Sequence, residues 1–440
     1  MSPRQEKLPA RGGRRFRAAR RTAAVVTAGA AVAVGAGFPL AGASPGTPGT
    51  PQAPSTIYLE DFQNVASPAP ILRLNQYTGA NGQSYFADPA WLSNCNGLVT
   101  SFGQDPNAPG PTSMSDCGPL TWNGSQQIAY ALGGSSANPA GNYAITAATG
   151  HDGVAVDPGA PKVEFQTGFQ AGQNIALPGK NRFLLLSYDV AVEGCQAAHP
   201  FLYWNLLDTA GTPSPLGVQI DPCGSPVLHP VTVPGIGLAP GPGDIDVGTF
   251  YAGATLYAGD SAGLQLVNNQ PSGGGNDHAF DNVKLMDATP QLDKSFDLSR
   301  AQPGQAVPLT FTITNTSELA AKNGWSFTDT LPLGMVVAGA AGTNCPSGVV
   351  TAPNGSSSIS VTGNLDLGMA SCTVTLNVTA AHDGNYTNGP GNITVVGLNP
   401  PADTTVQVVP MMSWPVGLAA AVLGSGAWLL GRRKEVVTTS

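Results

Sequence analysis

Charged residues are scarce in this sequence: Asp, Glu, Lys and Arg make up 10% of its 440 residues, against about a quarter of an average globular domain. Cations are scarcest in the body of the chain. Residues 44–410 hold eight Lys and Arg against 25 Asp and Glu, a net charge of −17. A surface of this sign repels phosphate backbones and anionic lipid, which excludes nucleic acid as a partner of this region.

Sustained helical periodicity is also missing outside the two ends of the chain. Short alternating apolar segments are separated instead by Gly, Pro and Asn, and the sequence contains 56 Gly and 39 Pro. This spacing is typical of sandwiches and barrels, and the 42% hydrophobic content is too high for disorder. We expect an all-β protein of two antiparallel β-sandwich domains, over residues 57–287 and 288–409, followed by one C-terminal transmembrane helix.

The N-terminal end reads as an export signal. Eight cations fall in residues 1–21, an uncharged run of small residues follows, and Ala41-Gly42-Ala43 has a small-x-small cleavage pattern. That order is the one found in a signal peptide, expected here over residues 1–43. A retained N-terminal span is the alternative, and the route, Sec or Tat, stays open. A Pro-rich linker over residues 44–56 is expected to be extended and to lack a core.

The C-terminal end reads as an anchor. Residues 411–430 carry no charge and have about the length that crosses a bilayer. Arg432, Arg433 and Lys434 follow at once and belong on the cytoplasmic side by the positive-inside rule. We therefore expect a single span over 410–431, a cytoplasmic tail over 432–440 and an extracellular body. A buried core helix is the alternative.

Three segments resemble parts of bacterial surface proteins. Pro410, Ser413 and Trp414, then the span and the basic triplet, resemble an IPTL-CTERM sorting signal, although Met411 and Met412 stand where that signal has Thr-Leu. From residue 298 onward, the segments FTITNTS and FTDTLPLGMVVA resemble the Ig-like repeat of surface proteins with such tails, whose members are stalk or spacer modules. The segment GNDHAFDNV at 275–283 and YLEDF at 58–62 resemble the last and first strands of jelly-roll, galactose-binding-like modules.

The six cysteines favour disulfides in an exported chain. Nearest-neighbour pairing gives Cys95–Cys117, Cys195–Cys223 and Cys345–Cys372, one of 15 connectivities. Zinc is the alternative, but neither a CxxC nor an HxxxH spacing is present.

Calcium is the candidate cofactor. If the first and last strands of a jelly roll lie together, their oxygens could reach one ion. The five residues concerned are Glu60, Asp61, Asn276, Asp277 and Asp281. The alternative is that these side chains cap turns.

Two further patterns point to a ligand or a reaction. Trp91 and Trp122 flank the first cysteine pair and could stack on a glycan, or could be structural. Ser261 stands in a G-x-S-x-G pattern, with His151 as the base of note, but a nucleophile elbow needs a helix after the Ser and a strand follows here. A turn is the alternative to this hydrolase reading.

Lys294 and Asn388 could form an intramolecular isopeptide bond, with Asp329 as the proton-shuttling acid. Several Ig-like domains of Gram-positive surface proteins resemble this arrangement, in which the three groups lie on adjacent strands. The chemistry requires that all three are buried together, so that the lysine becomes neutral. A solvated lysine is the alternative.

These patterns together predict a membrane-anchored cell-surface protein with a structural or adhesive role and no enzymatic activity. The alternatives are a glycan-binding module displayed on an Ig-like stalk and a secreted serine hydrolase. The expected partners are the membrane, cell-wall or host glycans, and surface proteins.

Overall fold

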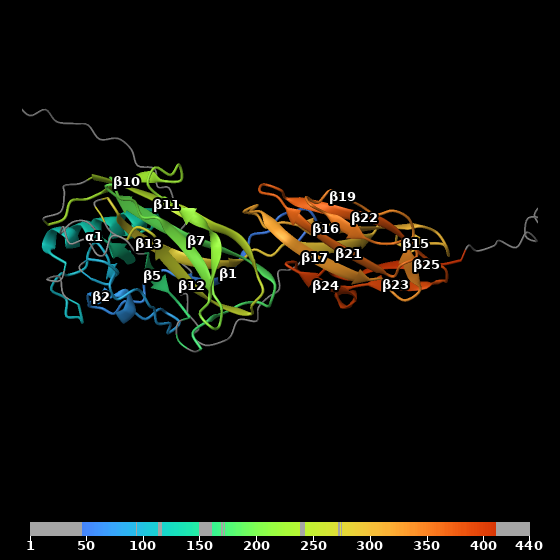
Figure 1. Ribbon diagram of the computed structural model, residues 1–440, viewed down its shortest axis with the longest axis horizontal. Helices are drawn as coiled ribbons and strands as arrows, with labels where there is room; N and C mark the ends of the chain where they lie inside the picture. The colour runs from blue at the N-terminus through green and yellow to red at the C-terminus, as the bar shows by residue number, and fades with distance from the viewer. Residues whose placement is uncertain are drawn as a thin grey trace, which may run out of the picture. The chain divides into compact units, whose positions relative to one another are not determined.

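The structure is a computed structural model, and it describes residues 46–93, 95–112, 117–148, 161–168, 170, 172–237, 243–271, 273 and 275–410. It is an all-β chain with one α-helix among these residues (Figure 1). Within the described part, no helix has the length and apolar character needed to span a bilayer. The predicted signal peptide, and the predicted span and tail apart from Pro410, lie outside the described residues.

The first module is built from two sheets that face each other across a core. The larger sheet has the order β10 (His229–Val233), β11 (Gly243–Tyr257), β7 (Arg182–Glu193), β13 (Asp277–Asp287), β4 (Ala144–Ala147), β3 (Leu98–Thr100) and β2 (Leu72–Arg73), and β1 (Ser55–Glu60) also pairs with β13. The smaller sheet has the order β5 (Lys162–Gln166), β12 (Ser261–Asn268), β8 (Leu202–Leu207) and β9 (Pro213–Ile220), with β6 (Ile175–Ala176) on β12.

The core of the first module forms because alternate residues of its long strands are apolar and point to the same face. Leu184, Leu186 and Val190 of β7 meet Leu264 and Leu266 of β12 in one buried cluster. The antiparallel pairing of β7, β11 and β13 places these strands side by side (Figure 1). The first strand, β1, pairs with the last strand, β13, as the sequence predicted, and the jelly-roll assignment stays a prediction.

The helix α1 (Pro119–Leu132) was not predicted from the sequence. Pro119 at its first turn supplies a backbone angle that suits a helix start. Ile128, Ala129 and Leu132 pack against Ala191 of β7 and Ala279 of β13, on the outer face of the larger sheet. The expectation that helical structure is confined to the chain ends was therefore wrong.

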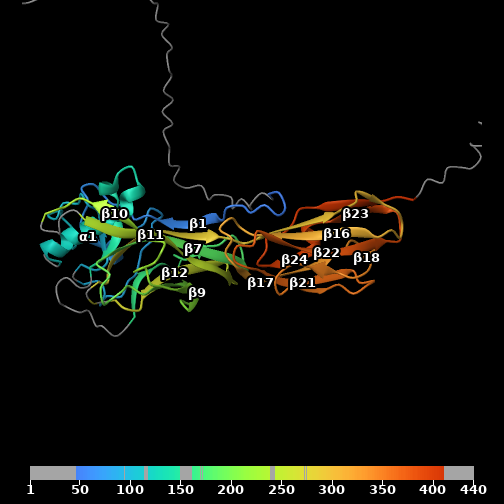
Figure 2. The ribbon, with the colours of Figure 1, turned by 90° about the horizontal axis from the view of Figure 1, so that it is seen from above.

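The second module also consists of stacked antiparallel strands. Its first sheet has the order β14 (Gln291–Phe296), β16 (Val307–Thr314), β22 (Ser371–Ala380) and β18 (Met335–Val337), with β19 (Gly342–Thr343) on β22. Its second has the order β20 (Val349–Thr351), β21 (Ser358–Leu365), β17 (Lys322–Thr330) and β24 (Ile393–Val396). A third contains β15 (Arg300–Ala301), β25 (Thr404–Val408) and β23 (Gly384–Asn388). Figure 2 shows β16 and β22 side by side.

The segment predicted to be a linker without a core contacts the second module. Gln52 forms a parallel bridge with Thr316, and the backbone N–H of Ser317 donates to the carbonyl of Gln52. The backbone N–H of Gly49 donates to Oγ1 of Thr314 at 2.8 Å. Proline removes only its own backbone N–H, so Gly49 and Gln52 keep backbone groups that pair with β16 and the turn that follows it.

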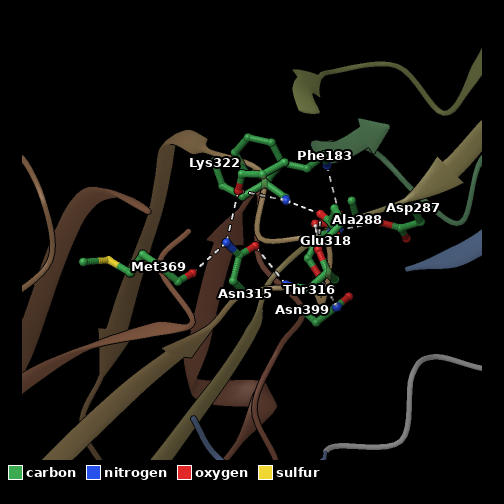
Figure 3. A network of polar contacts seen from close by, with 11 residues as sticks. Phe183, Asp287, Ala288, Asn315, Thr316, Glu318, Lys322, Met369 and Asn399 are labelled. Atoms are coloured by element: carbon green, nitrogen blue, oxygen red, sulfur yellow. Dashed lines mark hydrogen bonds and ion pairs between the residues drawn. The ribbon is translucent and has the colours of Figure 1, made fainter. Parts of the chain in front are cut away.

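A polar network holds the turn after β16 (Figure 3). Lys322 Nζ lies 2.6 Å from Glu318 Oε1, and Oγ1 of Thr316 donates to the same oxygen. Oγ1 of Thr316 also lies 3.3 Å from the carbonyl oxygen of Ala288, and the N–H of Ala288 donates to the carbonyl of Phe183 in β7. The segment between β13 and β14 is thereby fixed by hydrogen bonds on both sides.

Candidate functional site

A lysine, an aspartate and an asparagine meet in the interior of the second module. Lys294 Nζ lies 2.9 Å from Asp329 Oδ1 and 2.6 Å from Asn388 Oδ1. Asn388 Nδ2 donates to the second oxygen of Asp329 at 2.7 Å. The structure therefore brings together all three residues of the predicted crosslink, and each contacts the other two.

The three side chains come from strands of three different sheets. Lys294 lies on β14, Asp329 on β17 and Asn388 at the end of β23. In β14 the pattern of alternate burial turns Leu292, Lys294 and Phe296 to the inside. A lysine on the inner face of a strand has no route to solvent, so its charge has to find partners within the module.

The site is closed to solvent. The side chains of Lys294 and Asp329 have no exposed area, and Asn388 is fully buried. Burial lowers the pKa of Lys294, against the charge and the hydrogen bond of Asp329, which raise it. A lysine with a lowered pKa needs less free energy to give up its proton and become a nucleophile.

Gly389 supplies a further acceptor for Lys294. Its carbonyl accepts a hydrogen bond from Lys294 Nζ at 3.0 Å. A Cβ at this position would collide with a carboxylate oxygen of Asp403, so a larger residue would push the Asp403 side chain aside.

The arrangement supports one specific reaction. If Asp329 takes a proton from the lysine, the neutral Nζ can attack Cγ of Asn388, and Nδ2 leaves as ammonia after it receives a proton through Asp329. One C–N bond forms and one breaks, so no oxidant or cofactor is required. The unreacted alternative is an ammonium with three acceptors, namely Asp329, Asn388 and the carbonyl of Gly389.

The tryptophans proposed as glycan platforms are in the core. Trp91 and Trp122 are 0% and 1% exposed. Trp91 belongs to the main cluster of the first module, and Trp122 on α1 packs with the Cys95–Cys117 disulfide. Neither ring has a free face on which a sugar could stack, because each position near the disulfide turns its side chain inward.

The five residues proposed to share calcium are not all brought together. Asp61 and Asp281 are linked through Gln63 and Asn142, but Asn276 and Asp277 lie apart from them. Glu60 accepts hydrogen bonds from the hydroxyls of Tyr77 and Tyr85. Asp281 accepts from Asn142 Nδ2 and from the backbone of Asn282. The antiparallel register places Glu60 opposite Val283. Asp277, at the start of β13, lies opposite Glu193, and Asn276 just before it donates to the carbonyl of His199. Asp61 accepts from the backbone of Gln63.

The residues of the hydrolase alternative do not form an elbow. Ser261 is the first residue of the strand β12 and pairs with Ala176 of β6. A strand follows the serine where the elbow requires a helix. His151 lies outside the described residues.

The three disulfides join the pairs that nearest-neighbour spacing predicted: Cys95–Cys117, Cys195–Cys223 and Cys345–Cys372. The first and third are buried in apolar clusters.

Two buried ion pairs were missed by the sequence analysis. His278 Nε2 lies 2.8 Å from Glu164 Oε2, and both side chains have no exposed area. Lys322 is equally buried beside Glu318. In the sequence, each pair could be noticed only as a charged residue at a strand position where an apolar residue would be expected. Which positions of a strand face inward cannot be told until the strand register is known.

Comparisons with known proteins concern the second module and the fold. Residues 290–407 match the model of a domain of unknown function, DUF7933. No functionally curated protein matches the chain.

The chain is also similar to three solved adhesin structures at low scores. The N-terminal domain of the Streptococcus gordonii adhesin Sgo0707 has 10% identity and a TM-score of 0.25, covering 53% of this chain and 58% of that one. The C-terminal domain of the Streptococcus pyogenes antigen I/II-family protein AspA has 10% identity, a TM-score of 0.22 and coverage of 57% and 93%. The collagen adhesin of S. aureus has 10% identity, a TM-score of 0.20 and coverage of 57% and 88%. This chain thus spans 58% of the length of the Sgo0707 domain.

Proposed function

We propose that this chain is an exported, membrane-anchored surface protein whose second module is a stalk closed by a Lys294–Asn388 isopeptide bond. The stalk carries the first module away from the membrane, in a structural or adhesive role. The observation that carries the proposal is the mutual contact of Lys294, Asp329 and Asn388 at 2.6–2.9 Å in a site without solvent.

A crosslink at this position has a mechanical rationale. Lys294 lies at the start of the second module, and Asn388 is 94 residues later, close to its end. A bond between them joins β14 to β23. A pulling force that enters at β14 then passes through the bond to β23 and on to β25, and the strands between β14 and β23 in the sequence carry none of it. An ordinary buried ion pair at the same place would resist unfolding far less, because it costs desolvation free energy on both charges.

The placement outside the cell is supported by composition. Three disulfides are typical of oxidising compartments, and the acidic body between two basic ends has the charge distribution of a translocated chain. The glycan-binding alternative loses its two tryptophan platforms to the core, and no other observation favours it.

Peptide mass spectrometry of the purified full chain tests the crosslink. After reduction and digestion, we expect the peptides that contain Lys294 and Asn388 to be joined, at a mass lower by one ammonia than their sum. Asp329→Ala and Asn388→Ala should yield the two peptides separately. Asn377→Ala, at an exposed position of β22, is the matched control and should leave the joined peptide intact.

Unjoined peptides from the folded wild-type chain would overturn the crosslink. Anchoring is tested separately by adding protease to whole cells. We expect the body to be digested in intact cells, and its survival there together with loss in lysed cells would overturn the surface location.

A further inference from the structure

One disulfide lies among charged side chains at the surface of the first module. Cys195 follows β7 and Cys223 follows β9, and the bond joins these two loops. Cys195 is exposed. The four other cysteines are buried, with at most 6% of their area accessible, so a reductant in solution reaches the Cys195–Cys223 bond first.

A histidine and an aspartate stand beside this disulfide. His199 Nδ1 lies 2.9 Å from Asp221 Oδ2. The ligand atoms of His199, Asp221 and Cys223 all lie within 4.8 Å of one another, and they form the one such group of three among the described residues. The donors of a tetrahedral zinc site are about 3.4–3.8 Å apart, given metal–ligand bonds of 2.0–2.3 Å. Small side-chain rotations therefore suffice to close this set around an ion.

The imidazole is already oriented as a metal ligand would be. Nε2 of His199 lies 3.0 Å from the carbonyl of Gln196, which can only accept, so Nε2 carries a hydrogen. Nδ1 donates to the carboxylate of Asp221 in the oxidised chain, and a metal would take the place of that hydrogen. A metal-bound histidine characteristically donates its other ring N–H to a carbonyl or carboxylate in this way, which fixes the ring. The backbone N–H of Cys223 donates to Asp221 and holds that carboxylate in place.

We infer that reduction of the Cys195–Cys223 bond creates a zinc site formed by both thiolates, His199 and Asp221. Two thiols of a small reductant lose two electrons and leave as their own disulfide, and Cys195 and Cys223 each gain a hydrogen. Zinc then displaces the two thiol protons and the Nδ1 proton of His199, which leave to solvent, and binds both sulfurs, Nδ1 and one oxygen of Asp221. In the oxidised chain the sulfurs are neutral and weak donors, so histidine and aspartate alone cannot hold the ion.

Zinc binding at this site would then depend on whether the Cys195–Cys223 bond is oxidised or reduced. Under oxidising conditions the disulfide holds the two loops together, and under reducing conditions zinc would hold the same loops through the same sulfurs. The fold around β7 and β9 then survives reduction wherever zinc is present. This inference does not depend on the crosslink or on the membrane anchor, since its residues belong to the first module.

Cobalt and zinc binding to the full chain test the inference. The protein is treated with a mild thiol reductant, and alkylation mapping establishes that Cys195 and Cys223 alone have been reduced. We expect one zinc per reduced chain and none per oxidised chain. With cobalt in place of zinc, the reduced chain should show thiolate charge-transfer absorption and the visible bands of a tetrahedral site.

Variants separate this site from other metal binding. His199→Ala and Asp221→Asn should each weaken zinc binding at least tenfold, and because both side chains are partly exposed, circular dichroism should be unchanged. His229→Ala, an exposed histidine on β10, is the matched control and should bind as the wild type does. Absence of zinc from a chain with both thiols free would overturn the inference, as would equal zinc affinity in His199→Ala and wild type.

Discussion

Lys294 and Asn388 lie on strands that do not pair with each other, yet Nζ of the lysine is 2.6 Å from the amide oxygen of the asparagine. Asp329, from a third strand, is hydrogen-bonded to both of them. The contact is thus a property of the packed interior and not of a strand register. Its consequences extend to stability and to mechanics.

Loss of the bond should lower the stability of the second module. The crosslink closes a loop of 94 residues, which in the chain-entropy model is worth about 4–5 kcal/mol. We expect Asn388→Ala to reduce the free energy of unfolding by at least that amount, measured by denaturant titration. Asn377→Ala should change it by less than about 0.5 kcal/mol. An unchanged midpoint in Asn388→Ala would contradict a covalent closure.

Force spectroscopy should show how much chain the second module releases. If the crosslink is present, the segment between Lys294 and Asn388, which are 94 positions apart, stays closed when the chain is pulled from its ends. Under reducing conditions, Asp329→Ala should therefore lengthen the unfolding event by about 330 Å, given 3.3–3.6 Å per extended residue. Equal lengthening in wild type and variant would show that no bond forms.

Stability of the first module should depend on the protonation of His278. Burial alone lowers the pKa of His278, but the charge and hydrogen bond of Glu164 outweigh it and the pKa is raised. The stabilisation is therefore fully present below about pH 6.5, the usual value in an unfolded chain, and is lost as the pH rises through the raised value.

Urea titrations across neutral pH measure this loss. The free energy of unfolding should fall by up to about 1.4 kcal/mol per pH unit within that window. His278→Gln should weaken the dependence, to which His199 with its own raised pKa also contributes, and His229→Gln, at an exposed position, should leave it unchanged. A wild-type stability that rises across the same window would refute the assignment.

Gly397 should be essential at the contact between β24 and the first module. Its φ is +66°, and a Cβ there would lie 2.7 Å from Phe183 and 3.1 Å from Leu256. Gly304 has a similar φ of +79° but open space around it. We expect Gly397→Ala to cost about 1–3 kcal/mol more than Gly304→Ala, because overpacking adds to the same backbone strain. Thermal unfolding of the two variants measures the difference, and equal midpoints would rule the overpacking out.

The strands were predictable because their burial alternates. Val307, Leu309, Phe311 and Ile313 of β16 are apolar at every second position and buried in one cluster. The helix α1 was not predictable in this way, since it buries Thr121, Ser125 and Gln127 along with its apolar residues and shows no one-sided stripe.

The sequence could suggest that the residues of the candidate site lie close together, but it could not show that they do. The sequence places Lys294 near the first strand of the second module and Asn388 near a late one, and these positions suggest proximity. It does not show that Asp329 turns inward between two strands that pair on either side of it. The tryptophans near Cys95 and Cys117 illustrate the opposite failure, because nothing in a loop-like sequence shows that its aromatic rings enter the core.

The bridge between Gln52 and Thr316 also sets an order of events during synthesis. Gly49 precedes its partner Thr314 by 265 residues, so a ribosome has made nearly all of the first module before that partner exists. At about 5–20 residues per second, the delay is of the order of tens of seconds. Gly49 and Gln52 therefore reach their final positions only after the module that follows them has been made.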